Sequence, residues 1–224
     1  MQAIKGKKTF EVSRSELEKR TEHFEAVVVD IGTGDGKFVY RLAQAHPQWF
    51  CIGIDPVRAS LRDYSTRIYR KPSRGGLAQA NALYIIASVE NLPPELNGLA
   101  DRVYINFPWG SLLEAVVRAD RKVLANLVRI VSAGGSIEVR INYSIFSEPV
   151  PIEVKELPEL TIDYLDHELA PAYAQAGISI LDRRFVGKEE LNEIATTWSK
   201  RLAYGREPGT VYVKMGVMKG SHGR

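Results

Sequence analysis

A run of β-branched residues that ends in a glycine-rich loop constrains the fold of this chain more than any other sequence feature. Residues 26–31 are Ala-Val-Val-Val-Asp-Ile, which is typical of a buried parallel strand, and residues 32–36 are Gly-Thr-Gly-Asp-Gly. Glycines at a strand-to-helix turn let a ligand lie against the backbone. The sequence therefore predicts an α/β fold with a ligand site at this turn.

The same pattern of strand and helix recurs along the chain. After the first strand we expect a helix over 38–45, a strand over 50–54, a helix over 57–69, and strands over 82–87 and 102–106. A helix over 120–131, a Gly134-Gly135 turn and a strand over 136–143 follow. Beyond a proline-containing segment we expect a helix over 166–176, a strand over 178–185, a helix over 189–202 and a strand over 210–217. This alternation predicts a doubly wound sheet, preceded by a hairpin over 3–12 and a helix capped near Ser13.

Composition and charge fit a single domain over residues 1–224. The chain is 45% hydrophobic and 25% charged, which excludes disordered and collagen-like classes, and its net charge of +3 permits a polyanionic partner. The single cysteine, Cys51, excludes an internal disulfide, and the histidines lack partners at ligand spacing, so we expect no metal site. Because no stretch stays apolar for the roughly 18 residues that a membrane span needs, we expect a soluble cytoplasmic protein without membrane contact.

The spacing of the glycines favours a ligand with a cationic end over a dinucleotide. The dinucleotide fingerprint G-x-G-x-x-G needs glycine at position 37, which is Lys37. Asp30 and Asp35 would repel a pyrophosphate but could face the ammonium and sulfonium groups of S-adenosylmethionine. Asp55, at the end of the second strand, could accept both ribose hydroxyls. Two plainer interpretations stay open: a tight turn without a ligand, and a helix N-cap role for Asp55 ahead of Pro56.

Further blocks of sequence are similar to a known enzyme family. Phe107-Pro108-Trp109-Gly110 follows the strand over 102–106, where methyltransferases of this architecture place the target base. With five other ordered blocks, it makes the chain resemble the 16S rRNA (adenine(1408)-N(1))-methyltransferases of the KamB and NpmA type over nearly its whole length. The other blocks are 30–36, 53–55, 71–77, 90–93 and 198–202.

The resemblance implies a class I S-adenosylmethionine-dependent methyltransferase, which is a Rossmann-like α/β domain with a seven-stranded sheet. Residues 1–24 would form an N-terminal β-hairpin extension, and insertions over 144–177 and 186–209 would contribute to the active site and to RNA binding. The cofactor would be S-adenosylmethionine. The residues that the resemblance assigns to it are Asp30, Gly32, Gly34, Asp35, Asp55, Pro56, Ser88, Val89, Glu90 and Thr196.

The resemblance also implies how the target adenine is held. Trp109 and Trp198 would sandwich the flipped base, and the carbonyl group of Phe107 or Pro108 could accept a hydrogen bond from its exocyclic amine. Because adenine N1 carries a lone pair, no general base is needed, and catalysis can rest on positioning. Without the resemblance, two tryptophans so far apart in sequence are more simply core anchors.

Basic residues gather in places that the net charge does not reveal. The stretch over 58–74 carries Arg58, Arg62, Arg67, Arg70, Lys71 and Arg74 against Asp63 alone. We expect Arg67, Arg70, Lys71 and Arg74, with Arg201 and Arg206 further along, to bind the RNA backbone on either side of the flipped base. A solvated helix face is the plainer interpretation of such a run. At Glu207-Pro208 the chain departs from NpmA-like members, which continue with basic residues.

The implied function is methylation of N1 of the decoding-site adenine in the assembled 30S subunit, which would keep aminoglycosides from binding there. The enzyme would act as a monomer. Three other functions stay open: methylation of another rRNA or tRNA base, a ribosome-binding factor without catalysis, and an NAD-dependent oxidoreductase, which the glycine spacing disfavours most.

Overall fold

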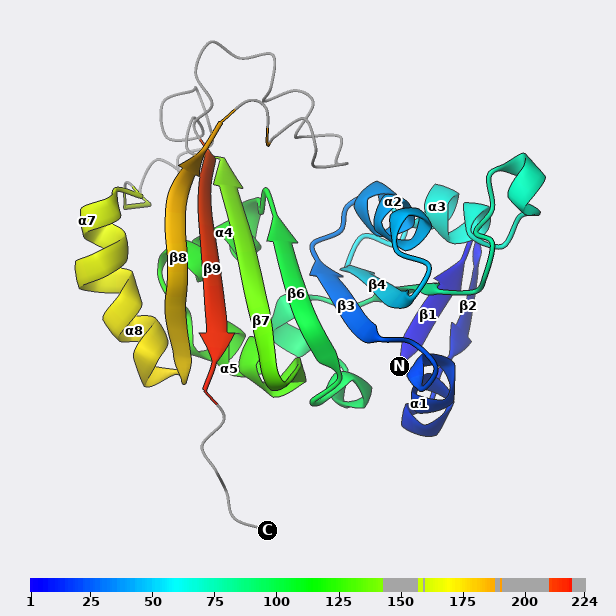
Figure 1. Ribbon diagram of the computed structural model, residues 1–224, viewed down its shortest axis with the longest axis horizontal. Helices are drawn as coiled ribbons and strands as arrows, with labels where there is room; N and C mark the ends of the chain where they lie inside the picture. The colour runs from blue at the N-terminus through cyan, green and yellow to red at the C-terminus, as the bar shows by residue number, and fades with distance from the viewer. Residues whose placement is uncertain (143–156, 159, 188–189, 191–209, 219–224) are drawn as a thin grey trace.

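The computed structural model describes residues 1–142, 157–158, 160–187, 190 and 210–218. They form one nine-stranded mixed sheet with helices on both faces, in the strand order β2-β1-β5-β4-β3-β6-β7-β9-β8 (Figure 1). The strands are β1 (Gln2–Lys5), β2 (Lys8–Glu11), β3 (Ala26–Ile31), β4 (Trp49–Asp55), β5 (Ala82–Ile86), β6 (Ala100–Asn106), β7 (Val131–Asn142), β8 (Ile178–Val186) and β9 (Thr210–Val217). The helices are α1 (Arg14–Thr21), α2 (Lys37–Ala45), α3 (Arg62–Arg67), α4 (Gly110–Val117), α5 (Arg121–Ile130), α7 (Ile162–Tyr164) and α8 (Ala170–Gln175).

The centre of the sheet is parallel and reverses its direction of growth at β3. From β3 the chain adds β4 and β5 on one side, then crosses back to add β6 and β7 on the other. Ligands of open α/β sheets bind outside the carboxyl ends of the strands at such a switch point. The fold therefore places a crevice beside the ends of β3 and β6, as the glycine loop predicts.

The predicted hairpin is confirmed, but it belongs to the sheet and is not a separate extension. Strand β1 pairs antiparallel with β5, with Ala3 opposite Ile85, and both Ala3 and Ile4 are fully buried. Seven strands, β3 to β9, correspond to the expected sheet. The hairpin adds two strands to these seven, because burial of its two apolar side chains fixes it to the sheet edge.

Each face of the sheet has its own hydrophobic core. Side chains of α1, α4, α5 and the helix over 162–175 pack against one face, while α2 and α3 pack against the other. Helix α1 begins as expected, because the Ser13 hydroxyl accepts a hydrogen bond from the backbone N–H of Glu16. No helix in the described part of the chain is long and apolar enough to span a membrane.

Several predicted boundaries differ from the structure. The helix expected over 57–69 is only α3, because turns occupy most of the flanking residues. The expected Gly134-Gly135 turn lies inside β7, where the pairing with β6 slips between Ala100 opposite Val131 and Arg102 opposite Ser136. Gly134 has φ +77°, so it absorbs this irregularity without ending the strand.

The helices around the last part of the fold also differ from expectation. Helix α4 was not predicted, since it is short and mostly apolar, with only Ser111, Glu114 and its C-cap Arg118 on an exposed polar face. The helix expected over 166–176 begins earlier, at Ile162, where the Thr161 hydroxyl caps it, and it includes a π-helical segment over Leu165–Leu169. Most of the helix expected over 189–202 lies outside the described residues.

Candidate cofactor and substrate site

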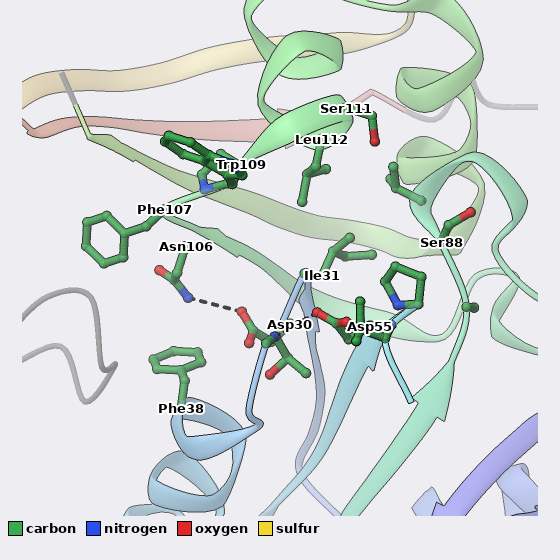
Figure 2. Close-up of a pocket in the computed structure, with 18 of the residues that line it drawn as sticks. Asp30, Ile31, Phe38, Asp55, Ser88, Asn106, Phe107, Trp109, Ser111 and Leu112 are labelled. Atoms are coloured by element: carbon green, nitrogen blue, oxygen red, sulfur yellow. Dashed lines mark hydrogen bonds between the residues drawn. The ribbon is translucent and has the colours of Figure 1, made fainter. Parts of the chain in front are cut away.

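A pocket of about 530 Å³ lies at the carboxyl ends of the central strands (Figure 2). Its walls come from the glycine loop after β3, the end of β4, the segment after β5, and the loop between β6 and α4. The structure thus brings together segments that are far apart in sequence. The predicted residues in its lining are Asp30, Gly32, Gly34, Asp35, Asp55, Pro56, Ser88, Val89, Glu90, Phe107, Pro108 and Trp109.

The glycine loop leaves room for a ligand against its backbone. Gly32, Gly34 and Gly36 all have a positive φ, a backbone conformation that residues with a side chain rarely adopt. A Cβ at Gly32 would lie 2.7 Å from Leu112 Cδ2, whereas a Cβ at Gly34 would meet no atom within 4 Å. The Oγ1 atom of Thr33 is buried and acts on the carboxyl group of Asp30. A bound ligand can therefore fill the space at Gly34.

Asp55 connects the end of β4 to the glycine loop. One carboxylate oxygen accepts the backbone N–H of Gly34 at 2.9 Å, and the other accepts that of Val57 at 2.8 Å. Burial raises the pKa of Asp55, and the two amide donors oppose this rise. The bond to Val57 closes a local turn and is not the expected helix N-cap, because α3 begins only at Arg62; each oxygen also has a second lone pair. The carboxylate can therefore fix the loop and accept two ligand hydroxyls together.

Asp30 is a buried carboxyl group at the base of the pocket. It is 3% exposed and accepts a hydrogen bond from Nδ2 of Asn106 at 3.1 Å (Figure 2). Burial raises its pKa to about 7, although the Thr33 hydroxyl, Asn106 and the charge of Arg140 oppose the rise. A cationic ligand group beside it would favour the ionised form. This environment suits an ammonium or sulfonium group and would exclude a phosphate.

The wall after β5 is a single turn of 3₁₀ helix that α5 holds in place. Asn126 of α5 donates from Nδ2 to the carbonyl oxygens of Val89 and Glu90, at 2.9 and 3.0 Å. A hydrogen bond from the backbone N–H of Glu90 lowers the pKa of the Glu90 carboxyl group, and Ser88 and Ser111 lower it further. An ionised acceptor therefore lies at this end of the pocket.

The loop between β6 and α4 has a strained backbone and presents an aromatic ring. Phe107 has φ +53°, a left-handed conformation that is costly for an aromatic residue ahead of proline. Its backbone N–H donates to the Arg140 carbonyl oxygen at 2.7 Å, which helps to hold this conformation. Trp109 follows at the start of α4 and is 49% exposed although it lines the pocket. An exposed tryptophan on a fixed loop is suited to stack on a flat ligand.

Sequence reasoning missed several residues of the pocket. Asn106 had a usable signal, because it is a polar residue at the carboxyl end of a strand adjacent to β3. Thr33 lies within the glycine motif itself, while Phe38, Ser111 and Leu112 carried no distinguishing signal. Four predicted residues lie outside the described part of the chain: Thr196, Trp198, Arg201 and Arg206.

The predicted basic segment contains α3 and, after it, a surface loop around a 3₁₀ turn, Pro72–Arg74. Arg70, Lys71 and Arg74 are exposed. Arg67 is half-buried, donates to the Gly75 carbonyl oxygen at 3.3 Å, and lies 4.9 Å from the ring centre of Tyr40. Arg67 therefore braces the loop, while the three exposed cations face solvent.

Comparisons with known proteins agree with this geometry. The family model of NpmA, described as 16S rRNA (adenine(1408)-N(1))-methyltransferase, matches residues 2–217. An Escherichia coli protein of that name is 38% identical, over 92% of this chain and 94% of its own. The crystal structure of the 16S rRNA methyltransferase KamB is 34% identical, with a TM-score of 0.89 over 98% of this chain and all of its own. A mutant of the Catenulisporales acidiphilia 16S rRNA (adenine(1408)-N(1))-methyltransferase, solved with the cosubstrate SAM, is 31% identical, with a TM-score of 0.89 over all of both chains.

Proposed function

Because this chain belongs to the family of 16S rRNA (adenine(1408)-N(1))-methyltransferases, we propose that the pocket at the carboxyl ends of β3, β4 and β6 is its active site. The enzyme uses S-adenosylmethionine to methylate N1 of adenine-1408 in 16S rRNA and so confers aminoglycoside resistance. The observation that carries the site assignment is the meeting of Asp30, Asp55 and Trp109 around one pocket. We place its action in the cytoplasm, as a monomer on the assembled 30S subunit.

The residues of the pocket fit S-adenosylmethionine. Asp30 would face the cationic methionine portion, Asp55 would accept the ribose hydroxyls, and the turn over 88–90 would lie along the adenine. The open space at Gly34 supports this assignment, since it lies where a ligand would complete the wall. When bound, the cofactor supplies an electrophilic methyl group on sulfur.

Methyl transfer requires the protein chiefly to position the target base against the methyl donor. Adenine N1 attacks with its lone pair, so no proton has to leave the base before transfer. Trp109 would stack on the flipped base, and the strained backbone of Phe107 would aim the carbonyl groups of Phe107 and Pro108 at its exocyclic amine. Trp198 would complete the stack from the other side. Both the angle and the distance of attack then depend on a fixed loop and not on an ionising side chain.

The direct test is primer extension across the decoding site of 30S subunits that have been incubated with the enzyme and S-adenosylmethionine. A methyl group on N1 blocks base pairing, so we expect a cofactor-dependent stop one nucleotide before adenine-1408. The same incubation with free 16S rRNA distinguishes an assembled substrate from naked RNA. A stop elsewhere, or equal modification of free RNA, would contradict the proposed substrate.

The exposed cations of the basic loop offer a separate prediction. Alanine at Arg70, Lys71 and Arg74 should leave the affinity for S-adenosylmethionine unchanged and weaken binding to 30S subunits, because phosphate contacts with these side chains are lost. The slope of log K against log salt should also become shallower by about 2. Alanine at Lys19 and Arg20 of α1 is a control for the removal of positive charge elsewhere on the surface. An unchanged salt slope in the triple variant would show that the loop does not contact RNA.

A further inference from the structure

Arg140 is a largely buried cation in the middle of a face of the sheet. Its side chain and that of Glu138 are each 13% exposed, and they form an ion pair at 3.3 Å. In the sheet register, Arg140 on β7 lies opposite Asn106 on β6 and opposite Tyr212 on β9. Its guanidinium carbon is 5.1 Å from the ring centre of Tyr212. Burying a cation is costly unless its partners are well placed, so its contacts point to a role.

Those contacts lead to both halves of the pocket. One guanidinium nitrogen donates to Oδ1 of Asn106 at 3.2 Å, and Nδ2 of the same amide donates to Asp30 at 3.1 Å. This pair of bonds fixes which end of the Asn106 amide faces Asp30. The backbone carbonyl of Arg140 accepts the N–H of Phe107, which begins the strained loop that carries Trp109. A single residue of β7 therefore contacts both the group beneath the cofactor site and the loop beneath the base site.

We propose that Arg140 is a positioning residue that acts through Asn106 to keep the Asp30 carboxylate oriented and ionised for the cationic portion of the cofactor. This inference rests on the proposed function, since it requires Asp30 to face S-adenosylmethionine. Without the guanidinium, the Asn106 amide loses the bond that fixes its orientation, and Asp30 loses both a reliable donor and a nearby positive charge.

Among the ionisable groups around Asp30, Arg140 carries the charge that acts on it most strongly. Asp55 on β4 is a second acid and disfavours ionisation. Cys51 on β4 and Tyr84 on β5 also interact with Asp30, and both have pKa values raised by burial, so they are neutral at pH 7. Within the described residues, Arg140 is the cation whose charge favours the ionised form of Asp30. The pKa of about 7 already lies close to the working pH, so loss of that charge should be measurable.

The test is the pH dependence of S-adenosylmethionine binding to Arg140→Met, measured by calorimetry as the ratio of its Kd to that of the wild type. If the pKa of Asp30 rises by about one unit, the ratio should be about fivefold at pH 7 and should return to about one at pH 9. Taking the ratio at each pH cancels the titration of the ligand itself. Arg140→Lys, which keeps the cation, should restore most of the affinity at pH 7, and Asn106→Ala should reproduce the loss.

Arg184→Met is the matched control. Arg184 lies on β8, two strands out from β7, opposite Tyr212 and 4.8 Å from the same ring, but it bonds Glu190 and not Asn106. The Arg184→Met variant should bind the cofactor with wild-type affinity at every pH. A ratio for Arg140→Met that is independent of pH, or wild-type binding by Asn106→Ala, would overturn the proposal. Asp30→Asn tests the proposed function of Asp30 separately from the role of Arg140. Wild-type affinity in that variant would refute the cofactor role of Asp30 itself.

Discussion

Replacement of Trp109 by alanine should reduce the rate of methylation of 30S subunits by about 100-fold while leaving the affinity for S-adenosylmethionine nearly unchanged. The ring is 49% exposed, so its removal leaves no cavity in the core. Stacking of a base on an aromatic ring is worth roughly 1–3 kcal/mol, and a misplaced base loses further rate through poor alignment. Single-turnover kinetics under saturating cofactor, alongside calorimetry with the cofactor alone, separate these two effects.

A phenylalanine at the same position provides the control. It retains a flat ring of smaller area, so Trp109→Phe should keep much of the activity that Trp109→Ala loses. Equal activity of the alanine variant and the wild type would show that Trp109 does not stack on the base. Equal loss of cofactor binding and methylation would show instead that the residue supports the pocket and not the target.

Replacement of Asp55 by alanine should weaken the binding of S-adenosylmethionine by roughly 100-fold or more. Two hydrogen bonds from ligand hydroxyls to a carboxylate contribute roughly 1.5–3 kcal/mol each, and a factor of ten in Kd corresponds to about 1.4 kcal/mol. The backbone N–H groups of Gly34 and Val57 would also lose their acceptor. Calorimetric titration of the purified variant with the cofactor measures the change directly.

Asp55→Asn distinguishes the two roles of this side chain. The amide keeps one oxygen acceptor and nearly the same shape, so its affinity should fall between those of the wild type and Asp55→Ala. Its thermal stability should stay closer to the wild type, since part of the loop bonding is retained. Wild-type cofactor affinity in Asp55→Ala would restrict the residue to its structural role at the end of β4.

Local sequence patterns predicted those parts of the fold that depend on neighbouring residues. The apolar run before Asp30 and the glycines after it determine β3 and its loop by themselves, and the cap at Ser13 determines the start of α1. The attachment of the hairpin to β5 was not predictable in this way, because it depends on which sheet edge can bury Ala3 and Ile4. The length of α3 likewise depends on turns that carry no strong sequence signal.

The same distinction holds for the site. The resemblance and the motifs indicated Asp30, Asp55 and Trp109, and the structure brings all three to one pocket. The link from Asp30 through Asn106 to Arg140 was not apparent, because it runs across three strands and needs their exact register. In the sequence, Arg140 is one polar residue of an alternating strand, and nothing local separates it from a solvent-facing side chain.

The pairing of β1 with β5 also decides which strand ends the sheet. Strand β5 has the sequence Ala-Leu-Tyr-Ile-Ile and is almost wholly buried, so an open edge there would be a template for strands of other molecules. The hairpin replaces it with β2, a four-residue strand with a lysine at one end and a glutamate at the other. Short, charged edge strands resist intermolecular pairing. The first residues of the chain thus protect the folded enzyme from edge-to-edge aggregation.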